Sequence, residues 1–209
     1  MSRTAGASVV SPNSYSLILS SPRLRQSILP EGLIRSPYEI LDYRANLILH
    51  DPKGTKATFK RIQHIRFLQD GVSAILDHAW GDGVLVTGYH NSAGVLMGSF
   101  KDQGKRHLVI GLKQAMRKGE EVTFEVTREV MEGFPKAQEW LETTIDHPVR
   151  HMSCGVVFPR QRPCQQAAAS YEGRKIALPV VQLTGGKTML RLQMAQPRSH
   201  TPYKINWSW

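Results

Sequence analysis

The chain ends on the sequence YKINWSW, residues 203–209, in which large apolar side chains alternate with polar ones. Successive side chains of a β-strand point to opposite faces, so a period of two predicts a strand with one apolar face. That face would carry Tyr203, Ile205, Trp207 and Trp209. Each aromatic ring can bury about 150–250 Å². We expect these side chains to fill a core; the alternative is an exposed aromatic surface on which nucleic-acid bases stack.

The same period of two recurs far upstream. Residues 43–49 and 58–67 both alternate, and between them lies the sequence DPKG, residues 51–54. Pro at the second position and Gly at the fourth are typical of a tight turn. The three segments together predict a β-hairpin. In the second stretch the apolar residues change phase, which predicts a register change near Ile62.

Further apolar or alternating stretches predict more strands at 83–90, 95–100, 108–112, 122–126 and 151–158, and a second hairpin that joins 176–183 to 188–194. Residues 70–80 have the apolar spacing of one or two helical turns, and 160–172 has the composition of a long loop. About nine or ten short strands with turn signals between them predict an all-β fold. The expected fold is an antiparallel β-sandwich, Ig-like or jelly-roll-like.

The first 36 residues differ in composition from the rest. Residues 1–36 are basic and rich in Ser and Pro, which predicts an irregular, disordered leader. An organelle transit peptide or a wrong start of the chain would explain the same composition. Residues 37–209 are expected to form a single β-sandwich domain. The alternative is two small β-modules split near 118 or 146, where the composition shifts.

Several classes of protein are disfavoured by what the sequence lacks. No apolar run approaches about 18 residues, so no membrane span is expected. Two cysteines, Cys154 and Cys164, are too few for a secreted disulfide framework, which favours a cytoplasmic protein. Cys154 alternates with apolar residues and no C-x-x-C motif exists, so we expect a core cysteine, with neither a metal site nor a cofactor.

Motifs for catalysis are also weak. The GKT sequence at 186–188 lacks the earlier glycine and the following helix of a phosphate-binding loop, so a turn is expected there. A hydrolytic site could combine His147 or His151 with Ser153 or Cys154, but no nucleophile-elbow motif supports it. No catalytic residue is therefore predicted, and an enzyme is the least favoured of the function classes.

Charge is distributed unevenly along the chain, whose net charge is +10. Residues 119–146 hold eight carboxylates against two basic residues, whereas residues 147–209 hold nine Lys and Arg against one carboxylate. A basic face of this kind suits an anionic partner, and nucleic acid is the natural candidate. The expectation is instead that the acidic segment partly neutralises it. The candidate basic patch comprises Arg150, Arg160, Arg162, Arg174, Lys175, Arg198 and Lys204.

The leading functional hypothesis is a non-enzymatic binding or accessory β-module that recognises a protein partner through loops or a sheet edge. The candidate partner-binding loop contains Trp80, Asp82 and His90. Nucleic-acid binding through the basic C-terminal face is the first alternative. A hydrolase with a histidine-based site is the second.

Overall fold

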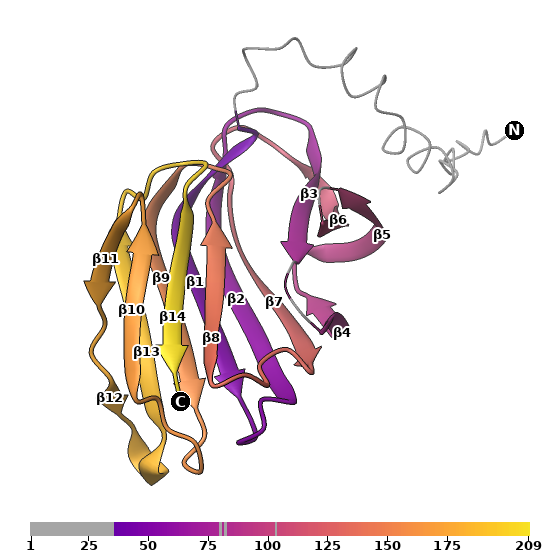
Figure 1. Ribbon diagram of the computed structural model, residues 1–209. Coiled ribbons are helices and arrows are strands. Elements are labelled where there is room, and N and C mark those ends of the chain that lie inside the picture. Colours follow the sequence, from indigo (N-terminus) through magenta and orange to yellow (C-terminus); the bar gives the residue numbers. More distant parts are fainter. Residues whose placement is uncertain (1–35, 80, 82, 103) are drawn as a thin grey trace, which may run out of the picture.

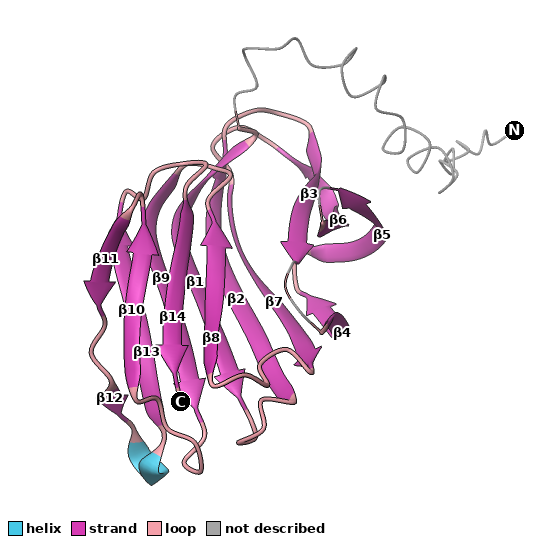
Figure 2. Ribbon diagram, viewed as in Figure 1, coloured by secondary structure: helices cyan, strands magenta, loops and turns pink. Residues whose placement is uncertain are grey.

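The computed structural model describes residues 36–79, 81, 83–102 and 104–209, with the backbone alone at residues 85 and 86. Fourteen β-strands account for nearly all of the regular structure in this part of the chain, beside one short 3₁₀ turn at Thr184–Gly186 (Figure 2). The predicted all-β fold is confirmed. The segment that has been described contains no helix with the length and apolar character needed to cross a bilayer. The predicted leader, residues 1–36, lies outside the described residues except for Ser36.

The strands are β1 (Tyr38–Leu49), β2 (Lys56–Phe67), β3 (Val72–Ala79), β4 (Val84–Asn91), β5 (Gly94–Asp102), β6 (Lys105–Met116), β7 (Glu121–Met131), β8 (Gln138–Thr144), β9 (Val149–Phe158), β10 (Gln166–Tyr171), β11 (Arg174–Ala177), β12 (Val181–Gln182), β13 (Thr188–Ala195) and β14 (Pro202–Ser208).

Three sheets are built from these strands. The largest has the order β12-β13-β9-β1-β2-β7-β4, the second has the order β11-β10-β14-β8, and the third is β3-β6-β5. The four-stranded sheet lies over part of the seven-stranded sheet and ends at β8, so β2 and β7 extend beyond its edge (Figure 1). Neighbouring strands pair antiparallel, except that β1 and β9 run parallel to each other. The architecture is a sandwich whose two layers differ in width.

The C-terminal strand fills the core as predicted. Tyr203, Ile205, Trp207 and Trp209 are each at most 7% exposed. The ring of Phe158 on β9 packs edge-on against both tryptophans, with ring centroids 5.7 and 5.8 Å apart. Edge-to-face packing at these distances is favourable beyond the area that it buries. The alternation in YKINWSW therefore seals the sandwich between β14 and β9.

The register change predicted near Ile62 is wrong. The ladder between β2 and β7 runs without interruption from Lys56 opposite Met131 to Arg66 opposite Glu121. Every second side chain of β2 consequently points into the sandwich. Two of these inward positions hold Arg61 and Gln63, which are 7% and 6% exposed. The break in the apolar pattern marks buried polar residues, not a change of strand register.

Three other predictions are corrected in the same way. The suggested helical turns at 70–80 are wrong, since β3 occupies this segment, and a bulge after Val72 explains its mixed periodicity. The second hairpin is reduced to two residue pairs of β12 and β13, because β13 pairs chiefly with β9. Part of the supposed loop at 160–172 is β10. The expected turn at Gly185 and Gly186 is confirmed, with φ of 73° and 75°.

Candidate functional site

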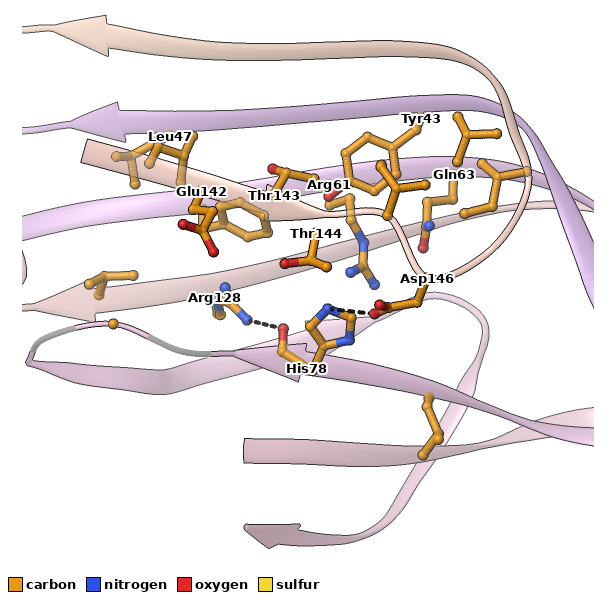
Figure 3. Close-up of a pocket in the computed structure, with 18 of the residues that line it drawn as sticks. Tyr43, Leu47, Arg61, Gln63, His78, Arg128, Glu142, Thr143, Thr144 and Asp146 are labelled. Atoms are coloured by element: carbon orange, nitrogen blue, oxygen red, sulfur yellow. Dashed lines mark hydrogen bonds and ion pairs between the residues drawn. The ribbon is translucent and has the colours of Figure 1, made fainter. Parts of the chain in front are cut away.

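A cavity of about 310 Å³ opens where the four-stranded sheet ends (Figure 3). Its floor is the inner face of β1, β2 and β7. One wall is β8 with the turn that follows it, and β3 forms the opposite side. The cavity thus lies over β2 and β7, between the edge of the four-stranded sheet and strand β3 of the third sheet.

Two buried arginines lie on the floor of the cavity. Arg61 on β2 and Arg128 on β7 are each 7% exposed. Arg61 forms an ion pair of 2.8 Å with Asp77 of β3, which is 1% exposed. Arg128 donates through Nη1 to the carbonyl of His78 at 3.3 Å and lies 4.4 Å from the ring centroid of Phe59. The Nε groups of both arginines are buried and have no hydrogen-bond partner in the described part of the chain.

The carboxylate of Asp77 is already well satisfied. It accepts hydrogen bonds from the backbone N–H of His78 at 2.7 Å and from the hydroxyl of Tyr89 at 3.1 Å, in addition to the ion pair with Arg61. Asp77 is thus paired with Arg61, its acceptor sites are largely in use, and no ion pair joins it to Arg128 among the described residues. The buried group as a whole carries one positive charge more than its own acid neutralises.

The ion pair identifies Arg61 as the compensated arginine, and the directions of the pKa shifts agree with it. Burial acts to raise the pKa of Asp77, but the charges of Arg61 and then Arg128 outweigh it and hold that pKa below the usual value. Burial acts to lower the pKa of Arg61, and Asp77 reverses the effect. The pKa of Arg128 is lowered, because burial and the nearby Arg61 outweigh the attraction of Asp77. Arg61 and Asp77 are thus the stable pair, and Arg128 is the surplus cation.

The wall formed by β8 is an open sheet edge. Strand β8 pairs with β14 on one side and is the last strand of its sheet. The backbone of Ile145 donates to Thr201, and the backbone of Trp209 donates to Ala137. These two hydrogen bonds lie at the two ends of the antiparallel ladder between β8 and β14, which has no register shift. Hydrogen-bonded pairs alternate along such a ladder, so the odd-numbered residues of β8 direct their backbone groups to β14. The even-numbered residues, 138, 140, 142 and 144, direct theirs to the free edge.

The rim of the cavity is polar. His78 Nε2 lies 3.5 Å from Asp146 Oδ2, and Figure 3 shows this pair beside the guanidinium of Arg61. Burial lowers the pKa of His78 to about 4, although Asp146 acts in the opposite direction. His147 is hydrogen-bonded through Nδ1 to Ser36 Oγ at 2.6 Å, and burial lowers its pKa as well. At neutral pH both imidazoles are therefore expected to be uncharged.

The residues considered for a hydrolytic site are not brought into one pocket. His147 lines the cavity, whereas His151 and Ser153 line a separate groove on the opposite face of the large sheet. Cys154 points into the sandwich, is 2% exposed, and lies 3.6 Å from Thr143 Oγ1. Burial raises the pKa of its thiol to about 11. The prediction that Cys154 is a core residue is confirmed.

The predicted partner-binding loop is only partly described by the structure. Trp80 and Asp82 lie outside the described residues. His90 is exposed on β4, opposite Thr127 of β7. The loop between β3 and β4 contributes Gly81 to the lining of the cavity. Its use for binding remains a prediction.

The predicted basic patch is spread over several elements. Arg150 pairs with Glu39 at 2.9 Å, and Arg198 pairs with Glu172 at 2.9 Å. Arg162 lies 3.9 Å from the ring centroid of Trp209 and donates to two backbone carbonyls. The remaining members are Arg160 after β9, the exposed Arg174 and Lys175 on β11, and Lys204 on β14, which lies over the ring of Trp140 at 4.2 Å.

The acidic segment 119–146 forms ion pairs within the large sheet. Its carboxylates on β7 pair across the strand ladder with basic side chains of β2: Glu121 with Arg66 and His64, Glu125 with Lys60, and Glu129 with Lys56. Several members of the basic patch have other partners, as described above. These contacts place much of the acidic charge on the outer face of β2 and β7, away from the C-terminal strands.

Comparisons with known proteins indicate the fold alone. No family model matches the chain, and no curated protein matches it. Among solved structures, a variant of a two-domain M1 zinc metallopeptidase bound to L-arginine matches with 10% identity and a TM-score of 0.51, over 82% of this chain and 43% of that one. The L-tryptophan complex of such a variant gives 12% identity and a TM-score of 0.50, again over 82% and 43%. An M1 zinc metallopeptidase from Deinococcus radiodurans gives 12% identity and a TM-score of 0.49, over 81% and 42%.

The chain thus spans about two fifths of the length of the structures it matches, with coverages of 42% and 43% of those chains. At these identities the likeness concerns the arrangement of strands. It carries no information on chemistry at the cavity, because function resides in particular side chains and not in the fold.

Proposed function

We propose that this chain is a binding module that recognises an extended segment of a protein partner by adding it as a strand to the free edge of β8. The observation that carries the proposal is the position of this edge, which forms one wall of the cavity. An unpaired strand edge presents a row of backbone donors and acceptors that another chain can use.

The floor of the cavity supplies what a strand added there would need. Neighbouring strands lie about 4.7–4.9 Å apart, so an added strand would run over the inner face of β2 and β7. Apolar side chains of this floor include Leu47, Phe59 and Val130. An added strand would place alternate side chains on the floor and the others in solvent. The backbone would supply affinity, and the floor would supply selectivity.

The other end of the same sheet is a poorer site. Strand β11, at the opposite edge, has four residues, all exposed, whereas β8 has seven. Strand β8 also lacks proline, which commonly protects natural sheet edges against pairing. Backbone hydrogen bonds with β8 would therefore be more numerous and better shielded from water.

The proposal can be tested with a displayed library of random peptides about ten residues long, enough to match a strand of this size. Peptides selected on the full chain are then measured against Glu142→Pro. Residue 142 directs its N–H to the free edge, so proline there removes an edge donor and leaves the ladder with β14 intact. Glu142→Ala is the matched control, because it loses the same carboxylate but keeps the N–H.

We expect selected peptides to bind Glu142→Ala almost as well as the wild type. Glu142→Pro should bind about tenfold or more weakly, since a buried peptide carbonyl loses its donor and the proline ring obstructs the added strand. Thermal melting would check that both variants fold. A library that yields no binding peptide, or peptides that bind the proline variant unchanged, would show that the proposal is wrong.

A further inference from the structure

We infer that Arg61 and Arg128 form a carboxylate-binding subsite, which takes one aspartate or glutamate side chain of the peptide added to β8. This inference rests on the proposed function and specifies the chemistry of its ligand. It assigns a role to two buried cations on the floor of the cavity.

Unused hydrogen-bond donors are the first observation behind this subsite. Buried polar groups in folded proteins almost always have a hydrogen-bond partner, and an orphaned buried donor is costly. The Nε groups of Arg61 and Arg128 are buried and have none among the residues that the structure describes. Both side chains nevertheless line the cavity and are not hidden behind it. A carboxylate that enters the cavity would therefore lie beside guanidinium groups whose hydrogen-bonding capacity is only partly used.

The balance of charge is the second observation. Asp77 compensates one of the two arginines, and its oxygens already accept from Arg61, Tyr89 and the backbone of His78. Among the described residues, the guanidinium of Arg128 has one long hydrogen bond to a carbonyl and packs on the face of the Phe59 ring. A carboxylate matches the planar fork of an arginine and can accept two parallel N–H groups.

The position of the two arginines fits the geometry of an added strand. They project from adjacent strands of the floor, with Arg61 opposite Val126 and Arg128 opposite Phe59 in the same ladder. Figure 3 shows the two guanidinium groups on either side of Thr144, the last residue of β8. Only every second side chain of an added strand points to the floor. The acidic residue is therefore required at one inward position, and a second acidic residue next to it would point to solvent.

Carboxylates that line the cavity restrict the number of acidic residues that a bound peptide can carry. Glu142, Asp146 and Glu139 line the cavity, and Glu139 also accepts a hydrogen bond from the backbone N–H of Lys136 at 2.6 Å. These groups repel a peptide that is acidic throughout. A single acidic residue directed at Arg61 and Arg128, flanked by neutral or basic residues, satisfies both the floor and the rim.

The decisive measurement compares paired peptides. For a peptide selected on the full chain, each Glu is changed to Gln, or each Asp to Asn, one position at a time, and binding to the wild type is measured by calorimetry. At one position the neutral peptide should bind about tenfold or more weakly, because the buried guanidinium of Arg128 is then left without a counter-charge. This comparison requires no change to the protein, so it does not depend on the folding of any variant.

Protein variants then assign the effect to the subsite. Arg128→Met removes the surplus cation and leaves the pair of Arg61 with Asp77 in place, so discrimination between the acidic and the neutral peptide should fall to about twofold or less. Arg66→Met is the matched control, since this arginine of β2 pairs with Glu121 on the outer face. It should discriminate as the wild type does. Arg128→Lys keeps the charge without the fork and should give an intermediate ratio.

The outcomes separate the two proposals. Peptides that bind and are weakened by Glu142→Pro, but show no loss at any acidic position, would overturn the subsite and leave strand addition standing. The subsite is also wrong if Arg128→Met discriminates as the wild type does. Binding of succinate, a small dicarboxylic acid, is measured as well. If succinate binds at Arg61 and Arg128 while no peptide does, the ligand is a small carboxylic acid and the proposal of a peptide ligand is wrong.

Discussion

The interior of the sandwich has two halves with different contents. Where the four-stranded sheet covers β9, the space is filled by Phe158, Trp207 and Trp209. Beyond the edge of β8, the same inner surface carries Arg61 and Arg128 beside a cavity. Both halves are built from strands with the same alternation of side chains. What differs is the element that covers them: the four-stranded sheet covers the closed half, whereas β3 and the edge of β8 flank the cavity of the open half.

This difference is informative about selection for function. Replacing a buried group of ions by well-packed apolar residues is often neutral or stabilising by about 1–4 kcal/mol. Stability alone therefore gives little reason to keep two arginines and Asp77 on an inner face. The closed half has the composition expected from packing, whereas the open half has a composition that a ligand would explain. This contrast is the reason for placing the binding site at the open half.

The largest effect is expected in the closed half. Trp207→Ala should lower the free energy of unfolding by roughly 3–5 kcal/mol, because a fully packed aromatic side chain is lost and a cavity remains. Trp140→Ala is the comparison in the open half, since Trp140 is half-buried at the edge strand and should cost much less. Urea denaturation of both variants would measure the two values. Equal losses would mean that the two halves are equally well packed.

An intermediate effect is expected from pH at the open half. Burial lowers the pKa of His78 to about 4 from an ordinary value of 6.5. The unfolded chain therefore binds a proton that the folded chain excludes between these two values. Stability from this group is complete above pH 6.5 and falls as the pH decreases toward 4, by on the order of 2 kcal/mol between pH 7 and 5. The pKa of Asp77 is lowered below 3.8, so its contribution is lost only at still lower pH.

Denaturation at pH 7 and at pH 5 would test this. His78→Gln should reduce the difference in unfolding free energy between the two conditions, because an amide does not titrate. His50→Gln is the control, since this histidine is exposed and hydrogen-bonded to Thr58 Oγ1 at 2.7 Å. If both variants kept the wild-type difference in unfolding free energy between pH 7 and pH 5, His78 would not be the source of the pH dependence.

The sequence was sufficient to predict the closed half. Alternation in 203–209 placed the correct side chains in the core, because an apolar face must be buried whatever covers it. Alternation in 43–49 also identified buried side chains, although Tyr43 and Leu47 line the cavity as well. The partners of each strand could not be predicted, since β1 and β9 pair across about a hundred residues of intervening chain. That β3, β5 and β6 form a separate sheet, inserted in the sequence between β2 and β7, could not be predicted either. Strand order depends on long-range contacts that leave no local pattern.

The open half was missed because its residues break the expected pattern. Arg61 and Gln63 follow Phe59 in strict steps of two and precede Ile65, so they occupy inward positions if the register is kept. The break in the apolar pattern alone predicts a shift of register. However, the stretch contains no glycine or other residue that favours a bulge, and this absence is the sequence feature that indicates an unbroken register with inward polar residues. The convergence of Arg128 and Asp77 on the same place required the tertiary structure.

The smallest effect is expected on the outer face of the same strands. Lys60 neighbours Arg61 on β2 but points outward, where its Nζ lies 2.8 Å from Glu125 of β7. Both side chains are about two fifths exposed, at 41% and 39%. Lys60→Ala should therefore change the free energy of unfolding by less than about 0.5 kcal/mol, and less at high salt, because water and ions screen an exposed pair. Denaturation at low and high ionic strength would measure it. A loss as large as that of a buried side chain would mean that the outer face of β2 also contributes to a protected site, and the contrast between the two faces would fail.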